Sequence, residues 1–390
     1  MLLTLGLMFV VGLALGAVCA RLKLPRLVGM MATGLLLGPH VLNLMDAGTL
    51  AVSADLRELA LIVILLRAGL SLDLAGLRRV GRPALMMSCV PALCEIFAYA
   101  LLGGTLLGLS TLESALLGAV MGAVSPAVVV PGMVGLMERG LGQRNSVPQL
   151  VIAGASMDDV FVIVVFTALL SMAQGGTVSA WSFAGIPVSI CLGIALGTAA
   201  GLALSALVSR WHMRDSVKVV LMLGCACLMA ALEELLKGYV PMSGLLSVMA
   251  MAAALRHRRA DVAERLASKF SKVWIAAEIA LFALVGAQVD PTLLAQAGVG
   301  ALAMIAAGLA IRALGVWLST ARTRLTLRER IFCAIAYMPK ATVQAAIGGV
   351  PLAAGLDCGG LVLAMAALAI VLTAPLGALA IQAAGPRLLD

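Results

Sequence analysis

Long apolar segments recur along the whole chain, separated by short stretches that contain proline, glycine and charged residues. A helix needs about 20 mainly apolar residues to cross the hydrocarbon core of a bilayer. We predict thirteen such transmembrane helices. They are expected near 2–20, 27–44, 56–73, 83–108, 112–134, 148–172, 184–208, 217–235, 239–255, 271–288, 293–319, 331–352 and 359–384. The expected fold class is therefore an all-α polytopic membrane protein.

The composition excludes a soluble globular protein. Of the 390 residues, 62% are hydrophobic and 12% are charged, with a mean hydropathy of +1.10. Soluble domains are usually about 45–50% apolar and about 25% charged. All cysteines except Cys358 lie within apolar segments, so we interpret them as small buried residues. We predict no disulfide framework, no zinc site and no cofactor.

Basic residues are distributed unequally between the two sets of loops. Most of the 27 Lys and Arg residues follow odd-numbered segments, as in the run RHRRADVAERLASK, whereas the opposite loops carry only Arg57 and Lys237. Cytoplasmic loops carry such an excess, so we predict an outside N-terminus and a cytoplasmic C-terminus. The net charge of +8 then reflects the membrane topology, and we predict no nucleic-acid partner. The basic run either contacts anionic lipid or is a solvated loop.

Two pairs of similar segments indicate an internal repeat. Pro25 opens LPRLVGMMATGLLLG and Pro241 opens VPMSGLLSVMAMAAA, while ILLRAGLSLD ends at Asp73 and FALVGAQVD ends at Asp290. The members of each pair lie seven predicted helices apart, so they cross the membrane in opposite directions. The pattern is typical of the inverted repeats of secondary transporters.

Two opposite charges occupy equivalent positions in this repeat. Glu95 lies midway along the fourth predicted helix, and Arg312 lies at the matching position of the eleventh. A buried charge is costly unless it is paired, so we expect the two side chains to meet. Such a pair either supports a charged site or only ties two helices together.

Prolines interrupt two predicted helices that also match in the repeat. The fifth contains GAVSPAVVVPG, with Ser125 and Pro126, and the twelfth contains YMPKATVQAAIGGVP, with Pro339 and Thr342. Proline removes a backbone donor and clashes with the preceding turn. Broken backbone is tolerated at membrane depth where it lines a cavity, so the matched breaks favour a midplane ion site over simple kinks.

Lys340 follows Pro339 directly and has two interpretations. Its ammonium group either neutralises the carbonyl end of a half-helix or extends along its helix toward the cytoplasm.

The stretch GASMDDVFVIVVF places Asp158 and Asp159 near the middle of the sixth predicted helix. A charge at that depth costs about 2.5–3.5 kcal/mol on insertion scales. Neighbouring helix positions point about 100° apart, so we expect one aspartate to face a cavity and the other a basic partner. A cavity-facing carboxylate binds either a proton or a small cation that prefers oxygen ligands. Competition between the two would couple their transport.

These motifs resemble the monovalent cation:proton antiporter superfamily, in particular the sodium/proton exchangers with paired aspartates. GASMDDV is similar to their ion-binding helix, and GAVSPAVVVP and PKATVQAAIG are similar to their two broken helices. The similarity begins near Leu22 and includes LLRAGLSLD and LTAPLGALAIQAAGPRLL. The resemblance implies the sodium/proton antiporter fold, with two inverted repeats and crossed broken helices.

The resemblance also implies roles for the charged residues. Asp159 matches the aspartate that binds sodium or lithium and protons, with Asp158 as its neighbour. Arg312 matches a basic residue that pairs with Glu95, with Asp158 or with both. Lys340 matches the residue that steadies the crossing of the broken helices.

The resemblance further implies a homodimer in a lipid membrane, expected here to be a bacterial inner membrane, with an elevator-like alternating-access mechanism. A scaffold would comprise residues 1–82 and 213–290, and a moving core residues 83–175 and 291–390. A linker helix would occupy 176–212.

Two other functions share features with this sequence. A sodium-coupled symporter of organic anions shares the inverted-repeat architecture but requires a roomy polar cavity, and polar residues are sparse here. An intramembrane aspartyl protease also uses two aspartates, but they must share a proton from separate helices, whereas Asp158 and Asp159 are adjacent. The sequence therefore predicts a transporter and no enzyme.

Overall fold

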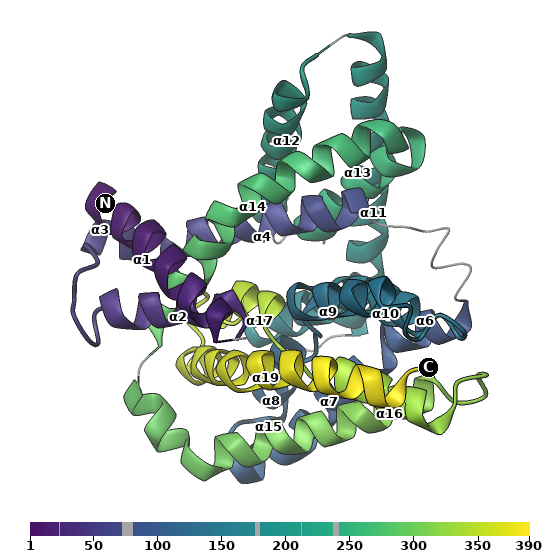
Figure 1. Cartoon of the computed structure of the whole chain (residues 1–390). Coiled ribbons are helices and arrows are strands. Elements are labelled where there is room, and N and C mark those ends of the chain that lie inside the picture. Colours follow the sequence, from purple (N-terminus) through teal and green to yellow (C-terminus); the bar gives the residue numbers. More distant parts are fainter. Residues whose placement is uncertain (23, 72–80, 176–179, 212, 237–241, 290) are drawn as a thin grey trace. The chain divides into compact units, whose positions relative to one another are not determined.

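The computed structural model describes residues 1–390 except 23, 72–80, 176–179, 212, 237–241 and 290 (Figure 1). All the regular secondary structure of the described residues is helical. The chain forms two compact units. Unit 1 comprises Met1–Ala54, Asp73–Ala173 and Leu281–Asp390, and unit 2 comprises Asp55–Leu72 and Gln174–Ala280.

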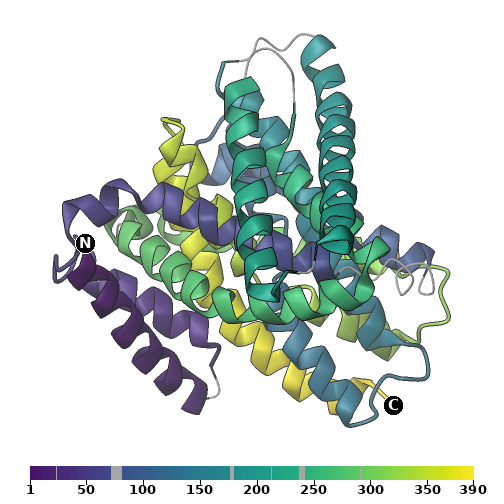
Figure 2. The ribbon, with the colours of Figure 1, turned by 90° about the horizontal axis from the view of Figure 1, so that it is seen from above.

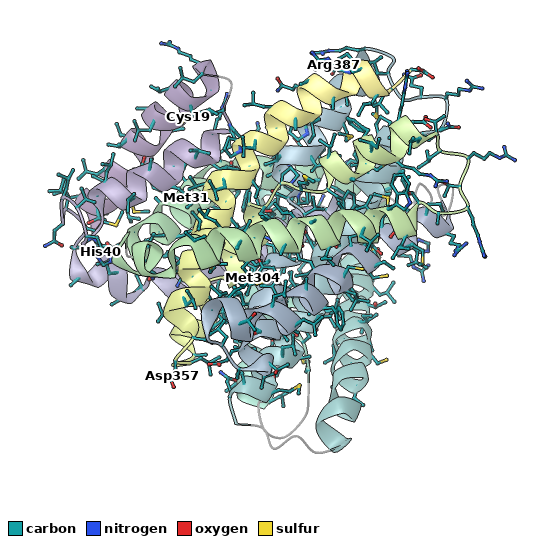
Figure 3. All side chains as sticks on the ribbon, turned by 90° about the horizontal axis from the view of Figure 1, so that it is seen from below. Cys19, Met31, His40, Met304, Asp357 and Arg387 are labelled. Carbon is teal, nitrogen blue, oxygen red and sulfur yellow. The ribbon has the colours of Figure 1, made fainter. Side chains whose placement is uncertain are left out.

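Unit 1 contains most of the helices. They are α1 (Leu2–Arg21), α2 (Arg26–Leu37), α3 (Ala47–Ala51), α6 (Arg82–Met87), α7 (Val90–Leu107), α8 (Thr111–Met121), α9 (Pro126–Glu138), α10 (Val147–Ala173), α15 (Pro291–Ser319), α16 (Leu327–Ala336), α17 (Thr342–Ile347), α18 (Val350–Ala353) and α19 (Gly359–Leu388). Helices α1 and α2 pack side by side (Figure 2). Helix α19 runs from just after Asp357 to the turn that carries Arg387 (Figure 3) and packs against α9, α15 and α16.

Unit 2 contains α11 (Ala180–Arg210), α12 (Asp215–Leu236) and α13 (Gly244–Arg258), together with most of α4 (Ser53–Ser71) and α14 (Ala260–Gln288). Glycines at four-residue spacing on α11 lie against α13. A side chain at Gly197 or Gly201 would overlap the backbone carbonyl of Ser247 or Met251. Small residues in this pattern let the backbones of membrane helices approach closely.

The long apolar helices confirm a polytopic all-α membrane protein. Among the described residues, nine helices are long and apolar enough to cross a membrane, and Arg26–Leu37 and Thr342–Ala353 are shorter apolar helices. The total of thirteen stays a prediction. The repeat positions Asp73, Pro241 and Asp290, and the loop residue Lys237, lie outside the described residues.

Several predicted boundaries were wrong, each for a local reason. The segment predicted at 27–44 ends as a helix at Leu37, because Pro39 disfavours helical backbone in the residue before it. The segment predicted at 83–108 divides into α6 and α7, with Pro91 in the first turn of α7. Helix α14 starts at Ala260, earlier than the predicted 271, because its first turns are charged and hydropathy does not detect them.

The same capping device starts both broken helices. Ser110 and Glu113 form a capping box at the start of α8, and Thr326 and Glu329 form one at the start of α16. In a capping box, two side chains satisfy backbone N–H groups that have no partner within the helix. The boxes occupy matching positions of the predicted inverted repeat, which stays a prediction.

An apolar core in unit 1 surrounds the two breaks. It includes Val124 from the first break, Tyr337 from the second, Ala155 from α10 and Ile381 from α19. The functional side chains described below therefore lie in apolar surroundings. The division into scaffold, core and linker concerns motion and stays a prediction.

We expect Gly197→Ala to destabilise the protein by about 1–3 kcal/mol, the usual cost of overpacking. The added methyl group would overlap the Ser247 carbonyl on α13. Gly224→Ala on α12 is the matched control, because nothing lies within 4 Å of its added methyl group. Thermal unfolding in detergent measures both variants. Equal midpoints would contradict the close packing of α11 on α13.

Candidate functional site

The two broken helices touch at their interruptions. Helix α8 ends at Met121 and α9 begins at Pro126, while α16 ends at Ala336 and α17 begins at Thr342. The backbone N–H of Ser125 in the first break donates to the carbonyl of Pro339 in the second, at 2.8 Å. Pro126 occupies the first turn of α9, where a missing N–H costs no helical hydrogen bond. The breaks therefore cross, as the family resemblance implies.

Lys340 binds the carbonyl end of the opposite broken helix. Its Nζ atom donates to the carbonyl of Met121 at 2.5 Å, and the side chain is fully buried. The interpretation that it extends to the cytoplasm was therefore wrong. Its backbone N–H also donates to Thr373 Oγ1 on α19, at 2.8 Å.

Gln344 supports the same carbonyl end and was missed by the sequence reasoning. Its Nε2 atom donates to the carbonyls of Ala123 and Val120, at 2.9 and 3.2 Å. Its Oε1 atom accepts from the Ala341 N–H at 2.8 Å. An amide in the apolar run TVQAAIGG was the signal that could have identified it, since buried amides are normally hydrogen-bonded.

Arg312 joins the two predicted acidic partners. From α15 its Nη1 atom lies 2.9 Å from Glu95 Oε2, and its Nη2 atom lies 2.9 Å from Asp158 Oδ2. Its Nε atom donates to the Tyr337 carbonyl at 2.7 Å, and Nη1 also donates to the carbonyl of Gly122. Of the alternatives left open by the sequence, the arginine thus contacts both carboxylates.

The four charged groups form a balanced set. Glu95 Oε2 accepts from Lys340 Nζ at 2.6 Å as well as from Arg312. Glu95, Asp158, Arg312 and Lys340, here called the charge cluster, are each at most 1% exposed. The cluster contains two carboxylates and two cations, so its formal charges cancel. Buried charges persist when they are paired and hydrogen-bonded in this way.

Asp158 also ties α10 to the first break. Its Oδ2 atom accepts from the Val124 N–H at 2.7 Å in addition to Arg312. Asp158 is therefore the aspartate that faces a basic partner.

Asp159 differs from its neighbour. Among the residues that the structure describes, neither an ion pair nor a hydrogen bond engages its carboxylate, whereas Asp158 Oδ2 has both. The Asp159 Oδ1 atom is buried. In the same described part of the chain, Asp158 Oδ1, Ser125 Oγ and Thr342 Oγ1 are buried without partners. These atoms are oxygens, the ligand type that small hard cations prefer.

Among the described residues, no group of three or more His, Cys, Asp and Glu side chains is arranged to hold a metal ion.

Comparison with known proteins agrees with this arrangement. The family described as "Sodium/hydrogen exchanger, transmembrane" matches residues 6–384. The chain belongs to the sodium/hydrogen exchanger family. It is 37% identical to sodium/hydrogen exchanger 9B2 of Mus musculus, a match that covers 94% of this chain and 69% of that protein. It is 33% identical to human sodium/hydrogen exchanger 9B1, over 86% of this chain and 67% of that protein.

The fold of this exchanger matches a solved antiporter. The structure of the sodium proton antiporter MjNhaP1 from Methanocaldococcus jannaschii at pH 8 superposes with a TM-score of 0.86. The match covers 98% of this chain and 97% of the other, at 20% sequence identity. The chain thus has the sodium/proton antiporter fold.

Family membership settles the class of activity. Sodium/hydrogen exchangers are integral membrane transporters that move ions and need no cofactor. The exchanger is thus no enzyme, which removes the aspartyl protease hypothesis. The family assignment supports cation/proton antiport over organic-anion symport.

Replacing Glu95 in the exchanger tests the charge cluster. We expect Glu95→Gln to lower the free energy of unfolding by about 3–5 kcal/mol, because two buried cations lose their shared carboxylate. Glu264→Gln is the control, because it breaks the ion pair of Glu264 with Arg256. The Glu264 side chain is 68% exposed, and surface ion pairs contribute little to stability. Thermal unfolding in detergent is the measurement. Similar midpoints for the two variants would show that the cluster does not stabilise the fold.

Proposed function

We propose that the chain is a secondary active antiporter that exchanges sodium or lithium for protons, with Asp159 binding cation and proton competitively. The observation that carries the proposal is the charge balance around the paired aspartates. The charge cluster is neutral without Asp159, so an ionised Asp159 is a surplus negative charge in apolar surroundings. Because such a charge is costly, a proton or a cation at Asp159 is favoured.

The hydrogen bonds of the two aspartates support different roles for them. Asp158 accepts from Arg312 and from the Val124 N–H, so its Oδ2 atom is committed to the protein. Within the described residues, neither an ion pair nor a hydrogen bond engages the carboxylate of Asp159. Asp158 is thus proposed to hold the site together, while Asp159 exchanges its occupant.

The hydroxyls of Ser125 and Thr342 are proposed as further oxygen ligands. Ser125 directly precedes α9 and Thr342 is the first residue of α17, and both hydroxyls are buried without partners among the described residues. The N-termini of these half-helices carry positive partial charge, which stabilises nearby negative charge.

The moving core of an elevator-like mechanism is proposed to comprise residues 83–175 and 291–390. The charge cluster and its carbonyl acceptors come from α7, α10, α15 and the two broken helices, which all lie within these ranges. A network of buried charges that joins these helices favours their movement as one body. If the core moves across the membrane only when a proton or a cation neutralises Asp159, the transport of the two ions is coupled.

The dimer and the orientation are also proposals. We propose a homodimer in which residues 1–82 and 213–290 form the scaffold, with residues 176–212 as linker. The distribution of Lys and Arg supports an outside N-terminus and a cytoplasmic C-terminus. The relatives named above are animal proteins, so they lend no support to the expected bacterial inner membrane.

Proteoliposomes with an internal pH-sensitive dye and an imposed pH gradient test the proposal. We expect sodium or lithium, and not choline, to drive proton movement in the unaltered protein, and we expect Asp159→Asn to abolish it because the amide cannot exchange a proton. Asp158→Asn should lower the rate about tenfold, the scale of one lost hydrogen bond to a charged group.

Asp261→Asn is the control, since its carboxylate is exposed and distant in sequence from the site. It should behave as the unaltered protein. Cation-dependent proton movement that survives in Asp159→Asn would refute the role of this carboxylate. Its absence from the well-folded unaltered protein at every pH tested would refute antiport.

A further inference from the structure

Tyr337 contacts Arg312 through both its backbone and its ring. It follows the last residue of α16, and its carbonyl accepts from Arg312 Nε at 2.7 Å. Its ring centroid lies 5.6 Å from the Cζ atom of the guanidinium. An arginine at this distance from an aromatic face is attracted to it, more strongly when water is excluded. Tyr337 is fully buried, so these contacts limit where the guanidinium can lie.

The other end of the Tyr337 side chain rests on α10, one turn before Asp158. A methyl group at Gly154 would overlap the Tyr337 hydroxyl oxygen, and its next contacts would be Met87 Cβ at 3.1 Å and Tyr337 Cζ at 3.3 Å. Residues four apart share one face of a helix, so the tyrosine lies against the face that carries Asp158. Glycine at position 154 provides the space for the hydroxyl.

The position of Arg312 decides which aspartate remains available. Asp158 and Asp159 are consecutive residues, and only Asp158 lies within ion-pair distance of the guanidinium. An arginine that moved to Asp159 would occupy the carboxylate proposed to bind the cation, and it cannot be displaced by losing its proton. A contact that keeps Arg312 on Asp158 would therefore protect the affinity for sodium.

We propose that Tyr337 is a positioning residue for ion exchange: wedged between Arg312 and Gly154, it keeps the guanidinium on Asp158 and leaves Asp159 to the transported cation. This inference rests on the proposed function of Asp159. It adds a specific pair, Tyr337 and Gly154, whose roles depend on each other.

A double-mutant cycle tests this dependence in proteoliposomes, with the KM for sodium and the maximal rate measured separately. Gly154→Ala should raise the KM about tenfold with little change in maximal rate, because a displaced tyrosine releases Arg312 to compete for Asp159. Tyr337→Phe keeps the ring but loses the oxygen that rests on α10, and should raise the KM about threefold. The double variant should return to the value of Tyr337→Phe alone, since the added methyl group then has no oxygen to overlap.

Two further variants and one further measurement complete the test. Tyr337→Leu removes the ring and adds no atom at position 154, so it should raise the KM for sodium about tenfold or more. This variant tests the role of the ring even if Gly154→Ala folds poorly. The increase in unfolding temperature with added sodium reports binding independently of transport and should fall in step with the KM change. Gly224→Ala, whose added methyl group meets nothing, controls for the substitution itself.

The outcomes separate the two proposals. A double variant as impaired as Gly154→Ala would show that the methyl group acts through Met87 or helix packing, and would overturn the inference. An unchanged KM in Gly154→Ala or in Tyr337→Leu would overturn it as well. Asp159→Asn is measured alongside: if it abolishes exchange while the cycle shows no coupling, only the role of Tyr337 fails. If it retains exchange, the proposed function itself fails.

Discussion

A guanidinium that cannot lose its proton, fixed in apolar surroundings, determines much of what lies around it. Arg312 is 1% exposed and remains charged at any physiological pH. Desolvating such a group is costly unless paired charges and hydrogen bonds compensate. Glu95 and Asp158 supply the charges, and the carbonyls of Gly122 and Tyr337 accept further N–H groups. Asp158 is thereby committed to the arginine, which distinguishes it from Asp159.

The same side chains solve a second problem, that of broken backbone in lipid. Each interruption exposes carbonyl and N–H groups that no helix satisfies, and the bilayer core offers no water to bind them. Lys340 and Gln344 donate to the carbonyl end of α8, and Asp158 accepts from the Val124 N–H. The buried polar and charged side chains therefore form hydrogen bonds with the interrupted backbone. In turn, the backbone carbonyl and N–H groups stabilise the buried charges. Each feature therefore stabilises the other.

The sequence contained the residues of this site but only part of its geometry. The repeat offset led to the contact of Glu95 with Arg312, because equivalent positions of a repeat can be found by their spacing alone. The matched prolines indicated two broken helices, and the crossing of those helices was implied by the family resemblance. Gln344 and Tyr337 were missed, since their partners are carbonyls or side chains that approach only once the helices cross. The carbonyl end of a half-helix was one of two interpretations of Lys340, and no sequence signal identified the opposite helix α8 as its partner. The predicted helix ends were wrong where charged turns extend the helix beyond its apolar stretch, as at the start of α14.

The long sequence separation within the charge cluster has a consequence for biosynthesis. Asp158 and Arg312 lie 154 residues apart, and Glu95 and Arg312 lie 217 apart. At a synthesis rate of about 5–20 residues per second, roughly 8–30 s separate the appearance of Asp158 from that of Arg312. During this interval the N-terminal half must accommodate its acidic residues without Arg312 and Lys340. The charge cluster can therefore form only after the second half has been inserted, so the site is completed late in biosynthesis.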